Sequence, residues 1–242
     1  MFRKLFPCCC LVLLLYFGSL GYANEDAFKV GEVLEYKLYA KSAIYGANEM
    51  IKVVSKDTFD GREVYRVHSE MTTVGIVKSL YNYSQTEDLI MDAEDFYPYW
   101  IRLNTQDRSK NQLEEIQFNY TAKKATRVMT KNGKTETSEI ELPGPVQDGL
   151  SLIFFLRQNQ ITEKPRKIYF YGNGKIDESN FDIKTISKPM RIENNTYSKY
   201  LQIIDQENQI TVLIAENRER LPFFVKKIAN FGAVDMRLSK SN

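Results

Sequence analysis

The chain has few of the side chains that carry chemistry. Its three cysteines are consecutive, Cys8 to Cys10, and its only histidine is His68. A zinc site needs cysteine and histidine ligands at short spacing, and nucleophilic catalysis needs an activated nucleophile beside a base. The sequence therefore predicts no catalytic, metal-binding or cofactor-binding residues. We expect His68 to be a solvated side chain on the polar face of a strand.

The chain also lacks an apolar run long enough to cross a membrane. The run at residues 8–17 has ten residues, about half of the roughly twenty that a transmembrane helix needs. Arg3 and Lys4 precede it, and Gly21-Tyr22-Ala23 follows it with small residues at the two positions that a signal peptidase reads. These features predict a cleavable signal peptide over residues 1–23 and no transmembrane span after cleavage. An uncleaved anchor is the alternative.

Cleavage after Ala23 would remove every cysteine and would change the charge. Removal of Arg3 and Lys4 lowers the number of basic residues from 33 to 31, which equals the number of acidic residues, so the net charge becomes zero. A neutral chain with interspersed signs has no long-range attraction for nucleic acid, so we expect no nucleic-acid partner. The remaining length suffices to bury a core without disulfides, and we expect residues 24–242 to form a single β-rich domain.

Apolar and polar residues alternate over much of the chain. This period of two is typical of strands with one face on a core, and it occurs in residues 34–41, 65–71, 115–120 and 210–214. Three dipeptides tolerate a positive φ at both central positions of a tight hairpin, namely Asp60-Gly61, Asn132-Gly133 and Asn173-Gly174. Such short turns join antiparallel strands, so the sequence predicts antiparallel pairing of successive strands.

One segment has the period of a helix. Its apolar residues, Leu150, Ile153, Phe154 and Leu156, predict the one long helix of the chain within residues 147–160, with its apolar face inside the sheet. Asp148 is placed to cap its amino end, and Arg157 lies near its carboxyl end. A shorter helical turn is predicted at residues 74–80. The fold class that follows is mostly β, a single antiparallel sheet curled into an open or closed barrel around one helix.

Five short motifs occur one after another along the chain. They are Gly31-Glu32, Leu34-Glu35-Tyr36, Asp60-Gly61-Arg62, Val146 to Ser151 running on to Leu156-Arg157, and Arg220-Leu221-Pro222. In their order and spacing they resemble a family of exported proteins of Gram-negative bacteria, domain of unknown function 3108. The resemblance implies a periplasmic, mostly antiparallel β protein with no assigned activity.

Tyrosine is the enriched residue with functional potential. Tyr169 and Tyr171 place two rings on one face of the strand that follows the helix, where they can line a pocket or simply fill the core. We hypothesise that Asp148, Arg157, Tyr169 and Tyr171 border a cavity for a lipid or another amphipathic ligand. The alternative is that Asp148 is a helix cap, Arg157 pairs with a carboxylate and the tyrosines belong to the core.

The sequence thus favours a non-enzymatic periplasmic protein of the cell envelope that binds an apolar or amphipathic ligand. A second class is an interaction protein that pairs an exposed edge strand with a partner. A third is an envelope hydrolase that uses two carboxylates, which would have to come from different strands because adjacent residues of a strand face opposite sides.

Overall fold

The structure is a computed structural model that describes residues 28–108, 110–158, 166–229 and 232–242. The expected signal peptide, residues 1–23, lies outside the described residues. The described residues include two helices, α1 (Gly75–Leu80) and α2 (Gly149–Gln158), and both begin and end within the ranges that the sequence predicts.

Fifteen strands form one large sheet, which confirms the mostly β fold. Its first part runs along the chain from β1 to β8: β1 (Val33–Ala40), β2 (Ile44–Phe59), β3 (Arg62–Thr73), β4 (Tyr83–Asp92), β5 (Pro98–Asp107), β6 (Lys110–Asn119), β7 (Lys124–Lys131) and β8 (Lys134–Glu141). The second part contains β9 (Val146–Gln147), β10 (Arg166–Gly172), β11 (Lys175–Ile186), β14 (Tyr200–Asp205), β15 (Ile210–Ala215), β16 (Pro222–Ala229) and β17 (Gly232–Ser241). A separate two-stranded sheet pairs β12 (Met190–Ile192) with β13 (Asn195–Tyr197), so the expectation of a single sheet needs this addition.

The two parts join through β1 and β17. The strand order is β8-β7-β6-β5-β4-β3-β2-β1-β17-β16-β15-β14-β11-β10-β9, and each neighbour pair except one is antiparallel. The three predicted hairpins lie between β2 and β3, β7 and β8, and β10 and β11. Both central residues of each turn have the expected positive φ, for example 51° at Asp60 and 77° at Gly61.

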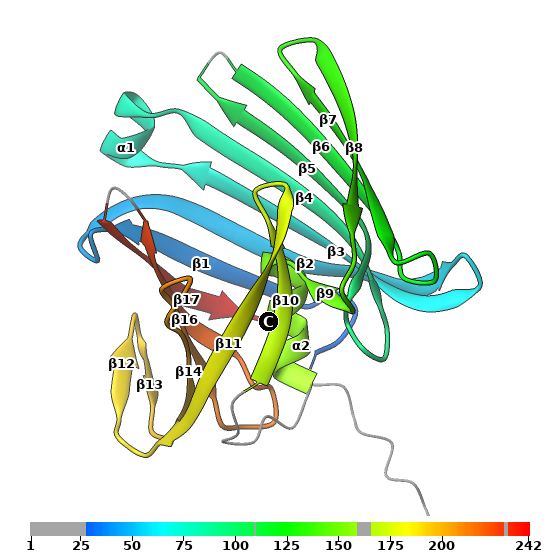
Figure 1. Ribbon diagram of the computed structural model, residues 1–242. Helices are drawn as coiled ribbons and strands as arrows, with labels where there is room; N and C mark the ends of the chain where they lie inside the picture. The colour runs from blue at the N-terminus through cyan, green and yellow to red at the C-terminus, as the bar shows by residue number, and fades with distance from the viewer. Residues whose placement is uncertain (1–27, 109, 159–165, 230–231) are drawn as a thin grey trace, which may run out of the picture.

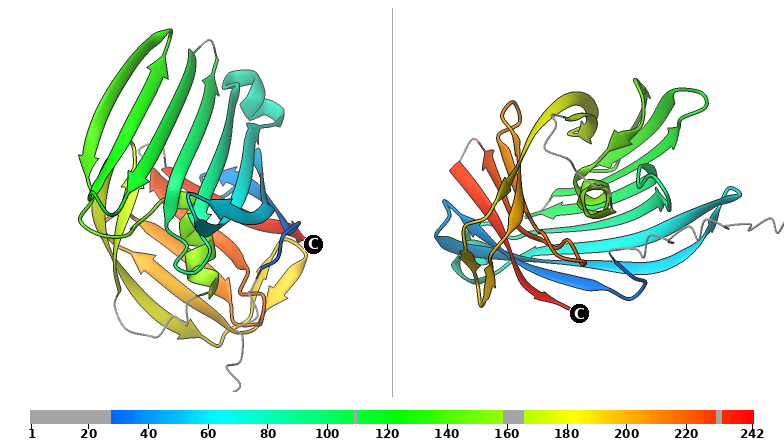
Figure 2. Two further views of the ribbon diagram at one scale, coloured as in Figure 1. Left: turned by 90° about the vertical axis from the view of Figure 1, so that its right-hand side faces the viewer. Right: turned by 90° about the horizontal axis from the view of Figure 1, so that it is seen from below.

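The exception is the parallel pair of β9 and β10, which the sequence did not predict. Helix α2 connects these two strands, and a crossover of that kind is what a parallel pair requires. The strands at the two ends of the order, β8 and β9, do not pair with each other, so the sheet is an open barrel. Seen from below, the sheet curls around α2, which lies inside the curve (Figure 2).

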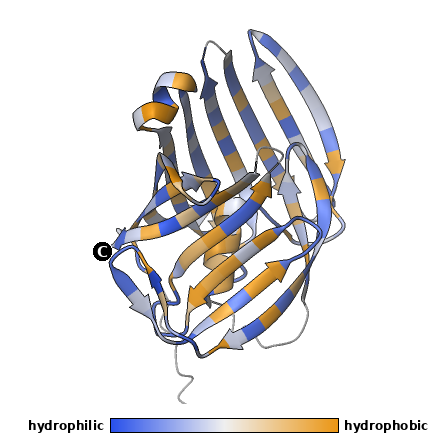
Figure 3. Cartoon of the chain, turned by 90° about the vertical axis from the view of Figure 1, so that its left-hand side faces the viewer, coloured by the Kyte–Doolittle hydropathy of each residue, from blue (hydrophilic) through white to orange (hydrophobic). Residues whose placement is uncertain are grey.

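Helix α2 is buried because it contacts core on more than one side. Leu150 and Phe154 belong to the larger hydrophobic cluster, which is built mainly on strands β1–β7, whereas Leu152 and Leu156 belong to a cluster on β10, β11, β14 and β15. The side chain of Phe154 is fully buried. The hydropathy colouring shows the helix among apolar strand segments, with blue and pale segments toward the free ends of β4–β8 (Figure 3).

The antiparallel order places alternate turns at opposite ends of the barrel. One end, termed the rim here, carries the turns β1–β2, β3–β4 with α1, β5–β6, β7–β8, β10–β11 and β14–β15. The site described next opens toward this end.

Candidate functional site

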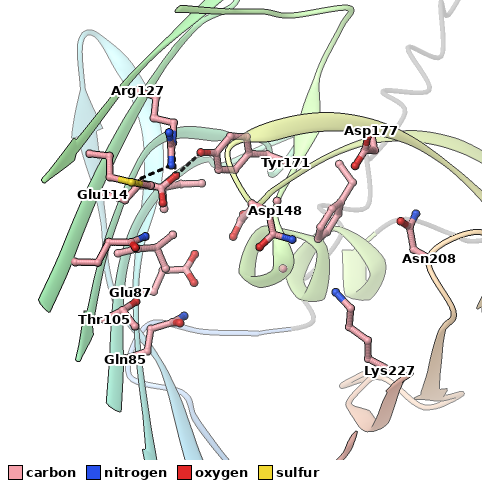
Figure 4. A pocket seen from close by; sticks show the side chains of 18 of the residues that line it. Gln85, Glu87, Thr105, Glu114, Arg127, Asp148, Tyr171, Asp177, Asn208 and Lys227 are labelled. Carbon is pink, nitrogen blue, oxygen red and sulfur yellow. Dashed lines mark hydrogen bonds and ion pairs between the residues drawn. The ribbon is translucent and has the colours of Figure 1, made fainter. Parts of the chain in front are cut away.

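A cavity of about 580 Å³ lies between the amino end of α2 and the inner face of strands β4–β7 (Figure 4). Gln85 and Glu87 on β4, Thr105 on β5, Glu114 on β6 and Arg127 on β7 form one wall. The other wall comes from β10, β11, β15 and β16, and two of its residues, Asn173 and Asn208, lie in turns of the rim. The cavity therefore extends from the helix to the rim.

The inner face of β4 changes character along its length. Leu89 and Met91 are buried in the core, whereas Tyr83, Gln85 and Glu87 lie on the same face nearer the rim and line the cavity. Strands β5, β6 and β7 change in the same direction. A strand face that is apolar at one end and polar at the other divides the barrel interior into a packed lower part and a polar upper part.

Asp148 caps helix α2 as the sequence predicts. Its carboxylate accepts hydrogen bonds from the backbone N–H groups of Leu150 and Ser151, each at 3.0 Å, and the Ser151 hydroxyl accepts one from the Asp148 N–H, also at 3.0 Å. These contacts satisfy backbone groups that a helix end leaves unpaired. Asp148 is buried and contributes to the cavity lining, so the cap fixes a carboxylate at the inner end of the cavity.

Glu87 faces Asp148 from β4. Burial raises the pKa of Glu87 well above its usual value, and the charge of Asp148 together with a hydrogen bond to it raises this pKa further. A protonated Glu87 that donates to Asp148 is the arrangement consistent with both effects. One carboxyl oxygen of Glu87, Oε1, is buried and, apart from the contact of this carboxyl group with Asp148, has no hydrogen-bond partner within the described part of the chain.

A second polar group links the two walls. The Glu114 Oε1 atom accepts hydrogen bonds from Arg127 Nε at 2.7 Å and from the Tyr171 hydroxyl at 2.5 Å. Glu114 is buried, and the Glu114 carboxylate raises the pKa of Arg127. Burial, followed by the contact with Glu114, raises the pKa of the Tyr171 hydroxyl. Tyr171 lies on β10, which does not pair with β6 or β7 in the sheet. The hydrogen bonds of Glu114 therefore connect β6 and β7 to β10 through side chains.

The four predicted site residues separate into two groups. Asp148 and Tyr171 both line the cavity. Tyr169 is not in the lining; its ring packs against the larger hydrophobic cluster, with Lys167 over the ring at 5.3 Å. Arg157 is not in the lining either, because it is fully buried at the other end of α2.

Arg157 forms a two-pronged ion pair with Glu32. Its two terminal nitrogens lie 2.6 and 2.8 Å from the Glu32 carboxylate oxygens, and its Nε donates to the Glu219 carbonyl at 3.1 Å. The guanidinium also lies 5.4 Å from the ring centre of Phe28. Arg157 therefore joins α2 to the start of β1 and to the β15–β16 turn.

Four of the motifs that carry the family resemblance meet at this point. Glu32 and Arg157 pair directly, and the Arg220 side chain donates to the Leu156 carbonyl at 3.3 Å. The Tyr36 hydroxyl donates to the Pro222 carbonyl at 3.0 Å. These motif residues thus lie together near the carboxyl end of α2, the end opposite to the cavity.

His68 lies outside the cavity, on the polar face of β3 as expected. Its Nδ1 and Nε2 atoms lie 2.7 Å from Asp88 and 3.0 Å from Glu70. Burial lowers the pKa of His68, but the hydrogen bonds to the two carboxylates outweigh it and the pKa is raised. Within the described ranges, no cluster of histidine, cysteine, aspartate and glutamate could hold a metal ion.

The sequence did not identify Glu87, Glu114 and Arg127 as site residues. A signal for them exists, because several strands carry polar residues on both faces near the rim, such as Gln85 and Glu87 beside Thr86 and Asp88. Two polar faces on one strand indicate either a surface strand or a polar cavity. Only the placement of α2 and β10 opposite these strands shows that they line a cavity.

The fold has a solved relative, whereas no curated protein matches the chain. The crystal structure of a beta-barrel-like protein of domain of unknown function DUF1849 from Brucella abortus superposes with a TM-score of 0.53, at 10% identity over 88% of this chain and 97% of that chain. At this identity the likeness shows the fold alone. The helices within the described ranges are too short or too polar to span a membrane. The family described as "Protein of unknown function (DUF3108)" matches residues 35–239, and the chain therefore belongs to this family.

Proposed function

We propose that this protein is an exported, non-catalytic binding protein of the cell envelope, and that an amphipathic ligand occupies the cavity between α2 and strands β4–β7. The observation that carries the proposal is a cavity of about 580 Å³ lined by the carboxyl group of Glu87, whose buried Oε1 atom has no hydrogen-bond partner among the described residues apart from the contact of this group with Asp148. Sites for small molecules have volumes of roughly 300–1,000 Å³ and few, well-placed polar groups. A buried polar atom costs free energy unless it is hydrogen-bonded, and a ligand would supply the bond.

The lining supports a ligand with an apolar part and a hydrogen-bond-donating head group. Apolar side chains contribute to both walls, namely Ile101, Leu103, Met129, Phe170 and Ile210. Four carboxyl-bearing residues line the cavity, against two basic ones: Glu87, Glu114, Asp148 and Asp177 against Arg127 and Lys227. Hydroxyl or ammonium groups suit such a site better than a carboxylate, which the acidic groups would repel.

The geometry gives less support to the two alternatives. The Glu87 and Asp148 carboxyl groups are in hydrogen-bonding contact, whereas the paired carboxyls of retaining glycoside hydrolases lie about 5 Å apart. Asp148 is also engaged by two helix N–H groups. The free edge strand β8 carries exposed charges, including Lys134, Glu136 and Glu139, which are features that oppose pairing with another strand.

Calorimetric titration with three ligands of one alkyl chain tests the ligand class. The probes are dodecylammonium, dodecyl glucoside and dodecanoate, each below its micelle concentration. We expect the first two to bind and dodecanoate to bind more weakly or not at all. Leu103→Trp should block binding by filling the cavity, whereas Arg102→Trp, on the outer face of the same strand, should not. Absence of binding by all three probes, or equal binding by Leu103→Trp, would contradict the proposal.

Export is tested separately. Terminal sequencing of the protein from the periplasm of a Gram-negative host should give a chain that begins at or near Asn24 and contains no thiol. A protein that retains Cys8, or that stays in the cytoplasm, would contradict export without bearing on the cavity.

A further inference from the structure

Large apolar side chains are exposed mainly at the rim. Among the described residues, eight large hydrophobic side chains are exposed, and six of them lie at or beside turns of the rim. The six are Ile44, Tyr45, Ile76, Leu80, Tyr81 and Ile228, and the other two are Val30 and Val54. Single exposed apolar residues are ordinary on a protein surface, whereas a concentration at one end indicates a surface that contacts another apolar phase.

Helix α1 presents the most exposed part of this surface. Ile76 is 69% exposed and Leu80 is 72% exposed. The helix is held to the sheet by its other side, where Val77 packs so closely on Gly46 that a β-carbon there would lie 2.9 Å from the valine. Ile76 and Leu80 are four residues apart and lie on one side of the helix. They therefore point away from the barrel. Helix α1 lies at the upper left of Figure 1.

Neighbouring contacts place the segments that carry these side chains side by side. At one end, Arg108 of the β5–β6 turn lies 5.4 Å from the Tyr81 ring and donates to the Leu80 carbonyl at 3.2 Å. Ile44 and Tyr45 precede Gly46, against which Val77 of α1 packs. Farther along the sheet, the Lys41 N–H donates to the Ala233 carbonyl at 2.6 Å, and Ala233 is the strand partner of Ile228. The surface therefore follows adjacent strands from β5 to β16.

Basic side chains surround the same surface. The rim turns and the strand residues that flank them expose six basic side chains, which are Lys41, Lys78, Arg108, Lys131, Lys134 and Lys175. The corresponding described positions expose one carboxylate, Glu207. One of the six, Lys175, is paired with Asp177 at 2.7 Å. The turns at the opposite end mix both signs, with carboxylates such as Asp60, Asp95 and Glu216. A chain that is close to neutral overall is therefore polarised, with its positive end at the rim.

We propose that the rim docks onto an anionic lipid membrane, with Ile76, Leu80 and Tyr81 in the headgroup region and the lysines on lipid phosphates. Peripheral membrane surfaces combine apolar side chains with lysine and arginine in this way, and tyrosine is enriched at the membrane interface. A second copy of the chain fits less well, because a symmetric dimer through the rim would bring two sets of basic side chains together. Docking places the cavity mouth against the bilayer, but it does not depend on a ligand in the cavity.

Flotation with lipid vesicles tests the docking. The chain is purified as an exporting host delivers it, so that every variant has the same amino terminus. We expect binding to vesicles of phosphatidylglycerol and phosphatidylethanolamine, weakening with added salt, and little binding to phosphatidylcholine alone. Ile76→Ser/Leu80→Ser and Lys41→Glu/Lys78→Glu should each lower the bound fraction by about tenfold or more. Val30→Ser/Val54→Ser, which removes exposed apolar side chains away from the rim, should bind like the wild type.

Hydrogen exchange of the wild type gives a second measurement without a substitution. Anionic vesicles should slow exchange in residues 41–46 and 74–82 and leave the β2–β3 and β4–β5 turns unchanged. Equal flotation of the rim variants and the wild type would overturn the proposal. So would rim protection that depends on protein concentration and not on vesicles, because that result would assign the surface to a second copy.

Discussion

Loss of the carboxylate of Glu32 should be among the most destabilising single changes in this protein. The Glu32→Gln substitution leaves Arg157, whose side chain is fully buried, with a neutral partner where it had two charged hydrogen bonds of 2.6 and 2.8 Å. Breaking a buried ion pair on one side costs about 3–5 kcal/mol, a large share of the roughly 5–15 kcal/mol by which a typical domain is stable. Arg157→Met should cost at least as much, because it also removes the bond to the Glu219 carbonyl.

The pair is best measured as a double-mutant cycle. If the main penalty of each single change is the loss of the charged partner, Glu32→Gln/Arg157→Met should lose less stability than the sum of its two single variants, by about 2–3 kcal/mol. The free energy of unfolding can be followed in urea by the fluorescence of Trp100, the only tryptophan of the chain.

The exposed pair of Lys199 and Glu216 provides the control, because its distance is similar at 2.8 Å but its side chains are 54% and 36% exposed. Exposed pairs contribute roughly 0–1 kcal/mol, so Lys199→Met/Glu216→Gln should show little coupling. A coupling energy for Glu32 and Arg157 no larger than that of the control, or a loss below about 1 kcal/mol for Glu32→Gln, would refute the reasoning.

Three further predictions follow from the helix and the cavity. Phe154→Ala should cost roughly 3–5 kcal/mol in urea unfolding, because the ring is fully buried, and a loss below about 1 kcal/mol would place the helix on the surface. Asp148→Ala should cost about 0.5–2 kcal/mol by removing the helix cap, which thermal unfolding at constant pH would show, and Asp148→Asn should recover most of this loss. Burial and Asp148 raise the pKa of Glu87 above its ordinary 4.5, so the folded chain holds a proton that the unfolded chain releases, and stability falls as the pH rises from 4.5 toward the raised pKa. Glu87→Gln should remove this part of the pH dependence of the melting temperature, and an unchanged pH profile would contradict a protonated Glu87.

The local features of the fold could be predicted from the sequence. The hairpin dipeptides adopt positive φ because asparagine, aspartate and glycine tolerate that region wherever they stand in a chain. The helix begins after Asp148 because the aspartate carboxylate meets helix N–H groups two and three residues away. Both interactions are short-range, and a single sequence contains them in full.

The candidate site could be predicted only in part, for a reason visible in its residues. Asp148 caps the helix and Tyr171 lies on the strand after it, so the sequence pattern around the helix indicated both residues. Glu87, Glu114 and Arg127 come from three strands whose inner faces meet α2 only after the sheet has curled. Nothing in the alternation of these strands distinguishes a polar cavity wall from a solvent-exposed face.

By itself the sequence determined the strands, the tight turns, the long helix and its cap, because backbone preferences and side-chain periodicity act over a few residues. The tertiary structure decided which distant groups meet. Arg157 and Glu32 are 125 positions apart, and Tyr171 reaches Glu114 across 57. It also decided that β9 and β10 are parallel, that the barrel stays open between β8 and β9, and that the exposed apolar side chains gather at one end. Each of these outcomes depends on how the long sheet curls around α2, and that curl brings together residues far apart in the sequence, which no short segment specifies.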